Sequence, residues 1–223
     1  MPVLDRQDDV FILDIGDTEN RLHPDWIASV NALLDEVEKG DGPRSLVTVA
    51  QGKFFSNGLD LDWVLANTGQ AEEYVSDVQR LLARMLTFPM VTVAALQGHA
   101  FAAGAMFSLA HDFRVMRRDR GYWCLPEAQI DLPFTPGMSA LVRARLTAQV
   151  AHEAMVTARR YGGYDAVAAE IVDASADATT IRAAAIDMAR DQTAKAGPTL
   201  GTIKARMYAP VVEALREKVT LPI

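Results

Sequence analysis

Hydrophobic positions in the first two-thirds of the chain form two kinds of pattern, short continuous runs and helically spaced sets. The continuous runs, rich in β-branched and aromatic residues, predict strands at 10–13, 45–50, 91–96, 113–116 and 121–124. The helically spaced sets predict helices at 24–40, 74–85 and 102–110. Because strands and helices alternate along the chain, we expect right-handed crossovers and a largely parallel sheet.

From about residue 136 onward the pattern predicts helices only. Apolar residues repeat at helical spacing within 141–146, 150–158, 166–172, 181–194 and 200–219. These stretches are alanine-rich and amphipathic, which is typical of helices that pack against another element or another subunit. No repeat, low-complexity tract or linker divides the chain. We therefore expect a single domain over 1–223, with an α/β core at 1–135 and a helical region at 136–223.

Composition and charge narrow the class of protein and of partner. The 223 residues, half of them hydrophobic, suffice for one domain with a substantial core. The 29 acidic and 22 basic residues give a net charge of −7, which argues against a nucleic acid partner. The single cysteine, Cys124, can form neither an internal disulfide nor a cysteine-based zinc site.

The sequence also lacks recognisable targeting features. It has no apolar run of about 18 residues, so we expect no membrane span. The N-terminal residues are acidic and lack the apolar stretch of a secretory signal. The final tripeptide, Leu221-Pro222-Ile223, does not match a peroxisomal signal. We expect a cytoplasmic protein.

Three segments are candidates for chemistry, and the first runs from Lys53 to Leu61 between a predicted strand and a helix. Gly58 permits a turn that presents successive backbone N–H groups, and the helix start adds further unpaired donors. The alternative is an ordinary strand-to-helix turn in which Asp60 caps the helix.

The second segment, 98–106, concentrates small residues where a predicted strand meets a helix. Such residues let a ligand approach the backbone, and a helix N-terminus favours negative charge. The alternative is close packing of the helix on the sheet, which needs the same small residues. The spacing of the glycines matches neither a dinucleotide fingerprint nor a phosphate-binding loop.

The third segment, 125–132, places Glu127 beside Pro126 among large apolar residues. A carboxylate in such surroundings has a raised pKa and can act as a base near neutral pH. The alternative is a glutamate in a first helical turn that faces water.

Taken together, these motifs resemble the crotonase (enoyl-CoA hydratase/isomerase) superfamily, over roughly residues 10 to 175. The matching motifs are F-S-N-G-L-D-L at 55–61 and H-A-F-A-A-G at 99–104, followed by 108–112 and 116–121. Within the superfamily, the chain looks most similar to Δ3,Δ2-enoyl-CoA isomerases. The resemblance implies a ClpP/crotonase-like spiral of ββα units with a helical C-terminal region. It also implies a homotrimer or a dimer of trimers.

The resemblance further implies roles for particular residues. The backbone amides of Leu59 and Ala103 correspond to those that hold a thioester oxygen, and Glu127 corresponds to a catalytic glutamate. Hydratases of this superfamily use a second glutamate, which here falls at Met106. A single base implies a proton shift from C2 to C4 of a 3-enoyl-CoA, with Met106 as an apolar part of the pocket wall that disfavours water. No metal or cofactor is implied, because coenzyme A enters as part of the substrate.

The same resemblance yields a set of expected substrate contacts. These are Lys53, Ser56, Asn57, Gly58, Asp60, Leu65, Phe101, Gly104, Met106, Trp123 and Phe134. Lys53 is a candidate for the phosphates of coenzyme A, as are Lys204 and Arg206 in the last predicted helix. Leu65, Phe101, Trp123 and Phe134 are candidates for the acyl pocket or, alternatively, for the core.

Two other activities remain open at this point. One is a different crotonase-type acyl-CoA reaction, such as hydration, thioester hydrolysis or decarboxylation, because a few pocket side chains decide the chemistry on this fold. The other is acyl-CoA binding without catalysis, against which Glu127 argues, since a carboxylate among apolar residues is costly to retain.

Overall fold

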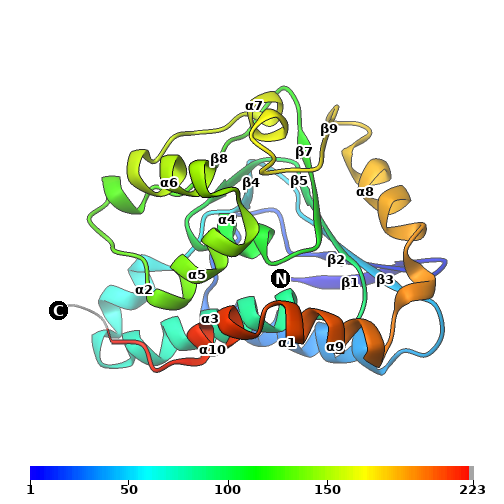
Figure 1. Cartoon of the computed structure of the whole chain (residues 1–223), viewed down its shortest axis with the longest axis horizontal. Coiled ribbons are helices and arrows are strands. Elements are labelled where there is room, and N and C mark those ends of the chain that lie inside the picture. Colours follow the sequence, from blue (N-terminus) through cyan, green and yellow to red (C-terminus); the bar gives the residue numbers. More distant parts are fainter. Residues whose placement is uncertain (221–223) are drawn as a thin grey trace.

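A computed structural model describes residues 1–220, so the tripeptide 221–223 considered above lies outside the described residues. The larger of two sheets has the strand order β1-β2-β3-β5-β7-β9, and only the β1–β2 pair is antiparallel (Figure 1). Its strands are β1 Val3–Gln7, β2 Val10–Asp14, β3 Ser45–Val49, β5 Thr92–Leu96, β7 Phe113–Arg117 and β9 Ala174–Ala176. The prediction of a largely parallel sheet is confirmed.

The second sheet is small, wholly parallel and ordered β4-β6-β8. Its strands are β4 Phe54–Ser56, β6 His99–Phe101 and β8 Trp123–Cys124. Each follows a strand of the larger sheet along the chain and precedes helical structure, which is the expected spiral of ββα units. Because all three strands are parallel, the segments that follow β4, β6 and β8 emerge at the same edge of the small sheet.

Four helices accompany the first strands. They are α1 Pro24–Lys39, α2 Leu61–Ala66, α3 Ala71–Leu86 and α4 Ala103–Leu109, with a 3-10 turn η1 at Thr68–Gln70. The helix α1 begins where predicted, with Pro24 in its first turn, and ends at Gly40. Every residue of α4 is buried, so this helix forms part of the core, whereas α2 buries none of its residues.

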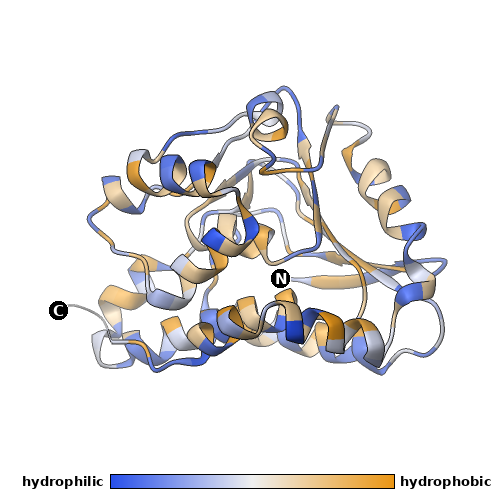
Figure 2. Ribbon diagram, viewed as in Figure 1, coloured by the Kyte–Doolittle hydropathy of each residue, from blue (hydrophilic) through white to orange (hydrophobic). Residues whose placement is uncertain are grey.

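The C-terminal region is mainly helical. It contains α5 Pro136–Arg145, α6 Ala148–Thr157, α7 Gly163–Ala168, α8 Ile181–Arg190, α9 Pro198–Met207 and α10 Ala209–Arg216, with η2 at Glu127–Gln129 and η3 at Thr193–Lys195. The helix α8 covers one face of the larger sheet, where Ile181 and Ile186 join the valines of β3, β5 and β7. A larger apolar cluster fills the other side, and the outer helices alternate hydrophobic and hydrophilic residues (Figure 2).

Two expectations for this region are wrong. The strand β9 interrupts the helices and pairs with β7, where Val115 faces Ala174. The strand β9 consists of three small residues, so no apolar run predicts it. The segment just before β9 is held by buried Arg114, whose Nε donates to the Ile171 carbonyl and whose backbone N donates to Asp173. The predicted helix 200–219 is two helices that meet at Tyr208, where Pro210 lies in the first turn of α10.

Candidate active site

Two backbone segments meet at the edge of the small sheet, one after β4 and one after β6. Gly58 has φ of +85°, and a Cβ atom there would lie 2.9 Å from the Phe101 carbonyl oxygen and 3.0 Å from the Ala103 nitrogen. Glycine is therefore required both by backbone conformation and by space. The contact brings the amides of Leu59 and Ala103 into one neighbourhood.

Within the described residues, neither of these two amides donates a hydrogen bond to the protein. The flanking amides do, since Gly58 N donates to Ser56 Oγ at 3.2 Å and Asp60 N to Tyr74 Oη at 2.9 Å. Ala103 is the first residue of α4, where amides lack partners in their own helix. Ala102 before it has φ of +50° and ψ of −127°, a strained backbone of the kind that functional sites retain.

The residues that carry the two free amides, Leu59 and Ala103, both line a cavity of about 380 Å³ whose surface is mostly apolar. Residues from five regions of the chain form its wall: Arg21, Asn57, Leu59, Leu61, Asp62, Val64, Val75, Phe101, Ala102, Ala103, Met106, Pro126, Glu127, Ile130, Leu132, Pro133, Phe134, Thr135 and Met138. An apolar cavity with two unpaired donors suits a ligand that carries a polarised oxygen on an apolar chain.

Glu127 supplies the carboxylate of this cavity. It begins η2 and is only 5% exposed, so the alternative of a water-facing glutamate is wrong. Its Oε2 atom has no hydrogen-bond partner among the described residues. Burial raises the pKa of the Glu127 carboxyl to about 7, and its own backbone amide opposes the rise. At neutral pH the group can therefore both accept and return a proton.

Met106 occupies the wall one turn of α4 beyond Ala103, and it is fully buried. Its thioether can neither donate nor accept a proton in acid–base catalysis. Glu127 and Asp62 are the carboxylates of the cavity wall, and Asp62 is held by Arg21 at 2.5 Å. The site therefore offers one unpartnered carboxylate.

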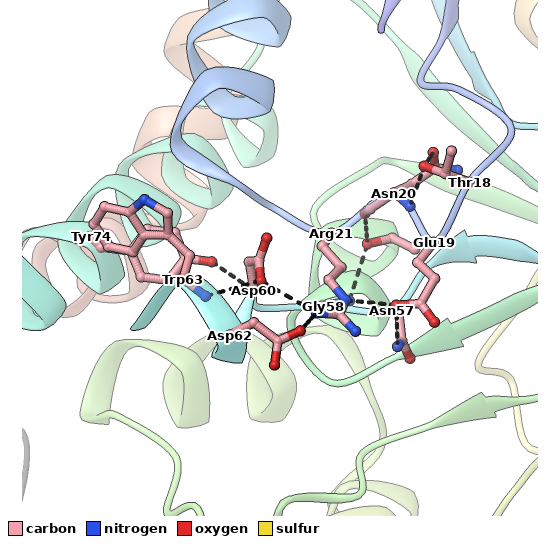
Figure 3. A network of polar contacts seen from close by, with 11 residues as sticks. Thr18, Glu19, Asn20, Arg21, Asn57, Gly58, Asp60, Asp62, Trp63 and Tyr74 are labelled. Carbon is pink, nitrogen blue, oxygen red and sulfur yellow. Dashed lines mark hydrogen bonds and ion pairs between the residues drawn. The ribbon is translucent and has the colours of Figure 1, made fainter. Parts of the chain in front are cut away.

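A polar network borders the cavity on the side of Leu59 (Figure 3). Arg21, from the β2–α1 connection, donates to Glu19 at 2.6 Å and also bonds Asp60 and Asp62. Asp60 caps α2 by accepting a hydrogen bond from Trp63 N at 3.2 Å, so the capping alternative is confirmed alongside the free amide of Leu59. The hydrophobic pattern gave no signal for Arg21, because it lies in a loop and its carboxylate partners at Asp60 and Asp62 are about 40 residues away in sequence.

With this geometry in place, comparison with known proteins identifies the family. The sequence profile of enoyl-CoA hydratase/isomerase matches residues 9–222. The chain belongs to the enoyl-CoA hydratase/isomerase family. Enoyl-CoA delta isomerase 3 of Arabidopsis thaliana is 38% identical over 219 residues, which cover 93% of this chain and 92% of that protein.

Two further family members agree with the assignment. Enoyl-CoA delta isomerase 2, peroxisomal, of the same plant is 40% identical over 185 residues, covering 79% of this chain and 77% of that protein. The solved apo structure of an enoyl-CoA isomerase of Mycobacterium tuberculosis has a TM-score of 0.89 at 25% identity, covering 96% of this chain and 94% of that one. The predicted crotonase-like fold is confirmed.

Most of the predicted site residues of this hydratase/isomerase family member fall into two groups. Those that line the cavity are Asn57, Leu59, Phe101, Ala103, Met106, Glu127 and Phe134. Ser56, Gly58, Asp60 and Gly104 lie behind the wall and shape the backbone. Ser56 Oγ donates to the Asn20 carbonyl at 2.7 Å, and a Cβ at Gly104 would lie 2.4 Å from the Ser56 carbonyl. The close helix–sheet packing considered for segment 98–106 is thus also present.

Two expected acyl contacts lie elsewhere. Trp123 is fully buried in the core, and its indole N–H donates to Ser108 Oγ at 3.2 Å. Leu65 is 75% exposed, because Leu61 and Val64, three residues apart on α2, turn to the cavity and leave Leu65 on the outside. Neither side chain lines the cavity, so the structure lends no support to either as an acyl contact.

The three cationic side chains expected to bind the phosphates of coenzyme A all lie outside the cavity wall. The Lys204 ammonium is buried between the Met90 carbonyl, at 2.7 Å, and Asp112, so it fastens α9 to the core and lies away from the cavity wall. Lys53 and Arg206 are exposed and lie outside the cavity wall. The Lys53 ammonium lies 5.1 Å from the centre of the Phe54 ring.

Residues 1–220 contain neither a metal-binding group nor a membrane-spanning helix. Within this range no three His, Cys, Asp or Glu side chains are grouped as metal ligands. None of the described helices combines the length and apolar character needed to cross a bilayer.

Proposed function

We propose that this protein is a Δ3,Δ2-enoyl-CoA isomerase that converts a 3-enoyl-CoA to the 2-trans-enoyl-CoA in fatty-acid β-oxidation. The observation that carries the proposal is the single unpartnered carboxylate, Glu127, in an apolar cavity with two free amides. The similarity to proteins named enoyl-CoA delta isomerases over most of the chain supports it.

The mechanism uses the backbone of Leu59 and Ala103 and one side chain. The two N–H groups bind the thioester oxygen, and the Glu127 carboxylate removes a proton from C2. The electrons of that C–H bond form a dienolate, whose negative oxygen the two amides stabilise. A donor of this kind contributes about 3 kcal/mol to the transition state. The protonated Glu127 then delivers the same proton to C4, which leaves the double bond between C2 and C3.

Met106 supports isomerisation over hydration. Addition of water across a double bond requires one group to activate the water and one to protonate the carbon. The position at which hydratases of this family carry the second glutamate is here a buried thioether. The apolar wall beside it disfavours an ordered water next to the acyl chain.

The proposed protein needs no metal and no cofactor, and coenzyme A arrives with the acyl-CoA substrate. We propose that the chain forms one domain, supported by an apolar cluster that extends from Phe11 to Val219.

We also propose a homotrimer or a dimer of trimers. Exposed Val156, Tyr164 and Val167 on α6 and α7 offer an apolar contact for a second copy. The proposed location is cytoplasmic, with neither nucleic acid nor membrane as partner.

An absorbance assay at the 2-enoyl thioester band tests the activity with purified protein. We expect a rising signal with 3-hexenoyl-CoA and no loss of signal with crotonyl-CoA in water. Consumption of crotonyl-CoA would show that one carboxylate suffices for hydration and would contradict the role given to Met106. Silence on both substrates would favour another acyl-CoA reaction or binding without chemistry.

A further inference from the structure

The loop that carries the Leu59 amide lies at the edge of the hydrophobic core, against which the Leu59 and Val64 side chains pack while only partly buried. Residues 57–60 form a loop between the short strand β4 and α2, and α2 buries none of its six residues. An oxyanion donor must nevertheless be held within a fraction of an ångström to act on the transition state. Polar contacts therefore have to supply the precision that packing does not.

The segment 19–22 supplies two of these contacts through its backbone. Asn57 N donates to the Glu19 carbonyl at 2.9 Å, and Leu22 N donates to the Gly58 carbonyl at 2.9 Å. The Gly58 carbonyl and the Leu59 N–H belong to one planar peptide group, so the second bond orients the peptide that carries the donor. This peptide is thereby held from its N-terminal side by a segment that belongs to another part of the fold.

Arg21 supplies the restraint on the other side of Leu59. Its Nη1 donates to Asp60 Oδ1 at 3.3 Å and to Asp62 Oδ2 at 2.5 Å, while its Nε donates to Glu19 at 2.6 Å (Figure 3). Asp60 N in turn donates to the buried Tyr74 hydroxyl at 2.9 Å. The residue after Leu59 is therefore held at both its side chain and its backbone.

The charges around Arg21 give it a second effect. Three carboxylates share one guanidinium, and these bonds raise the pKa of Arg21 further above its ordinary value. Without the guanidinium, Glu19, Asp60 and Asp62 would repel one another at the edge of the cavity. They would also oppose the negative charge that develops on the thioester oxygen beside them.

From these contacts we infer that Arg21 is a positioning residue, which sets the Leu59 amide through Asp60 for the developing oxyanion. The inference rests on the proposed isomerase function. It assigns Arg21 no contact with the reacting atoms. Lysine at this position would restore the charge but not the fork that joins Asp60 and Asp62.

Steady-state kinetics of Arg21→Met and Arg21→Lys with 3-hexenoyl-CoA test the inference. For Arg21→Met we expect kcat to fall about 10- to 100-fold, less than the roughly 100- to 1,000-fold for complete loss of one oxyanion donor, because the Leu59 amide is displaced and not removed. We expect the KM, and the Kd for unreactive hexanoyl-CoA, to change less than about threefold, and Arg21→Lys to recover part of kcat. A raised KM and Kd with unchanged kcat would overturn the inference and make Arg21 a direct contact of coenzyme A. Unchanged kcat and KM would also overturn it.

A double-mutant cycle with Asp60→Asn tests whether Asp60 is the link. Asparagine still caps α2 but no longer pairs with Arg21 as an ion. We expect Arg21→Met to cost little further kcat in the Asp60→Asn background, whereas additive losses would overturn the link. Asp77→Asn is the matched control, because Asp77 pairs with Arg80 on the exposed side of α3 and lies outside the cavity wall; its kcat should stay near wild type.

The position of the Leu59 amide signal in a 15N–1H spectrum separates this inference from the proposed function. In the protein without substrate, we expect Arg21→Met to shift the Leu59 signal and to leave the Ala103 signal in place. An unmoved Leu59 signal overturns the positioning role whether or not the wild-type protein isomerises 3-hexenoyl-CoA. Inactive wild-type protein with a shifted Leu59 signal would overturn the function and leave the positioning role standing.

Discussion

The two amides that face the cavity are held in place by different means. Ala103 begins α4, whose every residue is buried, and core packing fixes it so firmly that the strained backbone of Ala102 is retained. Leu59 lies in a loop before an exposed helix and is fixed by hydrogen bonds and ion pairs from residues 19–22 and Tyr74. The comparison teaches that one half of the site depends on packing and the other on polar contacts that substitutions can remove singly.

The largest expected effect on activity comes from Glu127, the base that forms the dienolate which the Leu59 and Ala103 amides stabilise. Glu127→Gln keeps the size of the side chain but removes the base, so we expect isomerisation of 3-hexenoyl-CoA to fall at least about 1,000-fold, within the range of general-base effects. Binding of hexanoyl-CoA should persist. Turnover that survives the substitution would identify another base and contradict the mechanism.

The same variant should gain stability in a pH-dependent manner. The pKa of the Glu127 carboxyl is about 7 in the folded protein and near 4.5 when unfolded, so ionisation destabilises the fold as pH rises between these values. Relative to wild type, Glu127→Gln should gain up to about 3 kcal/mol in free energy of unfolding at pH 8, and nothing below pH 4.5. Urea unfolding at several pH values measures this; a gain that does not vary with pH would refute the assigned pKa.

The loop that carries the Leu59 amide contacts the segment that carries the Ala103 amide at Gly58. Gly58→Ala therefore tests the spacing of the two amides. The new Cβ would meet the Phe101 carbonyl and the Ala103 nitrogen. We expect kcat to fall about 100-fold, as for loss of one donor, and the free energy of unfolding to fall by about 1–3 kcal/mol.

Gly42→Ala is the matched control for backbone strain. Gly42 has φ of +79°, but nothing lies within 4 Å of a Cβ there. It should lose stability and keep its activity. Equal losses of activity in the two variants would mean that strain, and not the spacing of the amides, explains the result at Gly58.

The dependence of kcat/KM on pH is the next largest expected effect, and it reports on Glu127, which serves both amides. Since Glu127 acts in its ionised form and its pKa is about 7, kcat/KM should rise about tenfold per pH unit below 7 and level off above it. Initial rates between pH 5 and 9 measure the profile. A profile already flat at pH 5 would contradict a base with a raised pKa.

The candidate site residues with a local sequence signal lie together in the structure, whereas contacts between distant segments left no signal in the sequence. The glycine motifs and the apolar neighbours of Glu127 are consecutive in sequence, and they located the cavity. Arg21 was missed because its bonds to Asp60 and Asp62 join segments about 40 residues apart, which no periodicity records.

The direction of a side chain within its element was the other feature that the sequence did not show. Leu65 and Val64 are adjacent on α2, yet only Val64 faces the cavity, since one residue rotates a helical side chain by about 100°. Trp123 lies beside Cys124 in a strand of two residues, too short for alternation to show which face is buried. The strand β9 depends on Arg114 and on pairing with β7, and its three small residues carry no pattern of their own.

The smallest expected effect concerns the start of α4, where packing in the core holds the Ala103 amide. Ala102→Gly removes the strain at φ of +50°, so the free energy of unfolding should rise by about 1 kcal/mol while kcat stays within about threefold. Ala158→Gly is the matched control, because Ala158 has φ of +54° at the end of α6, outside the cavity wall. A large loss of kcat for Ala102→Gly alone would mean that packing does not by itself fix Ala103.

Transfer of label tests the one-base mechanism most directly. With 3-hexenoyl-CoA carrying two deuterium atoms at C2, the product of the first turnovers can be analysed by NMR for deuterium at C4. Because Glu127 is buried and is the unpartnered carboxylate of the described cavity wall, the account predicts that much of the product carries deuterium at C4. Product whose C4 carries only hydrogen from the solvent would contradict it.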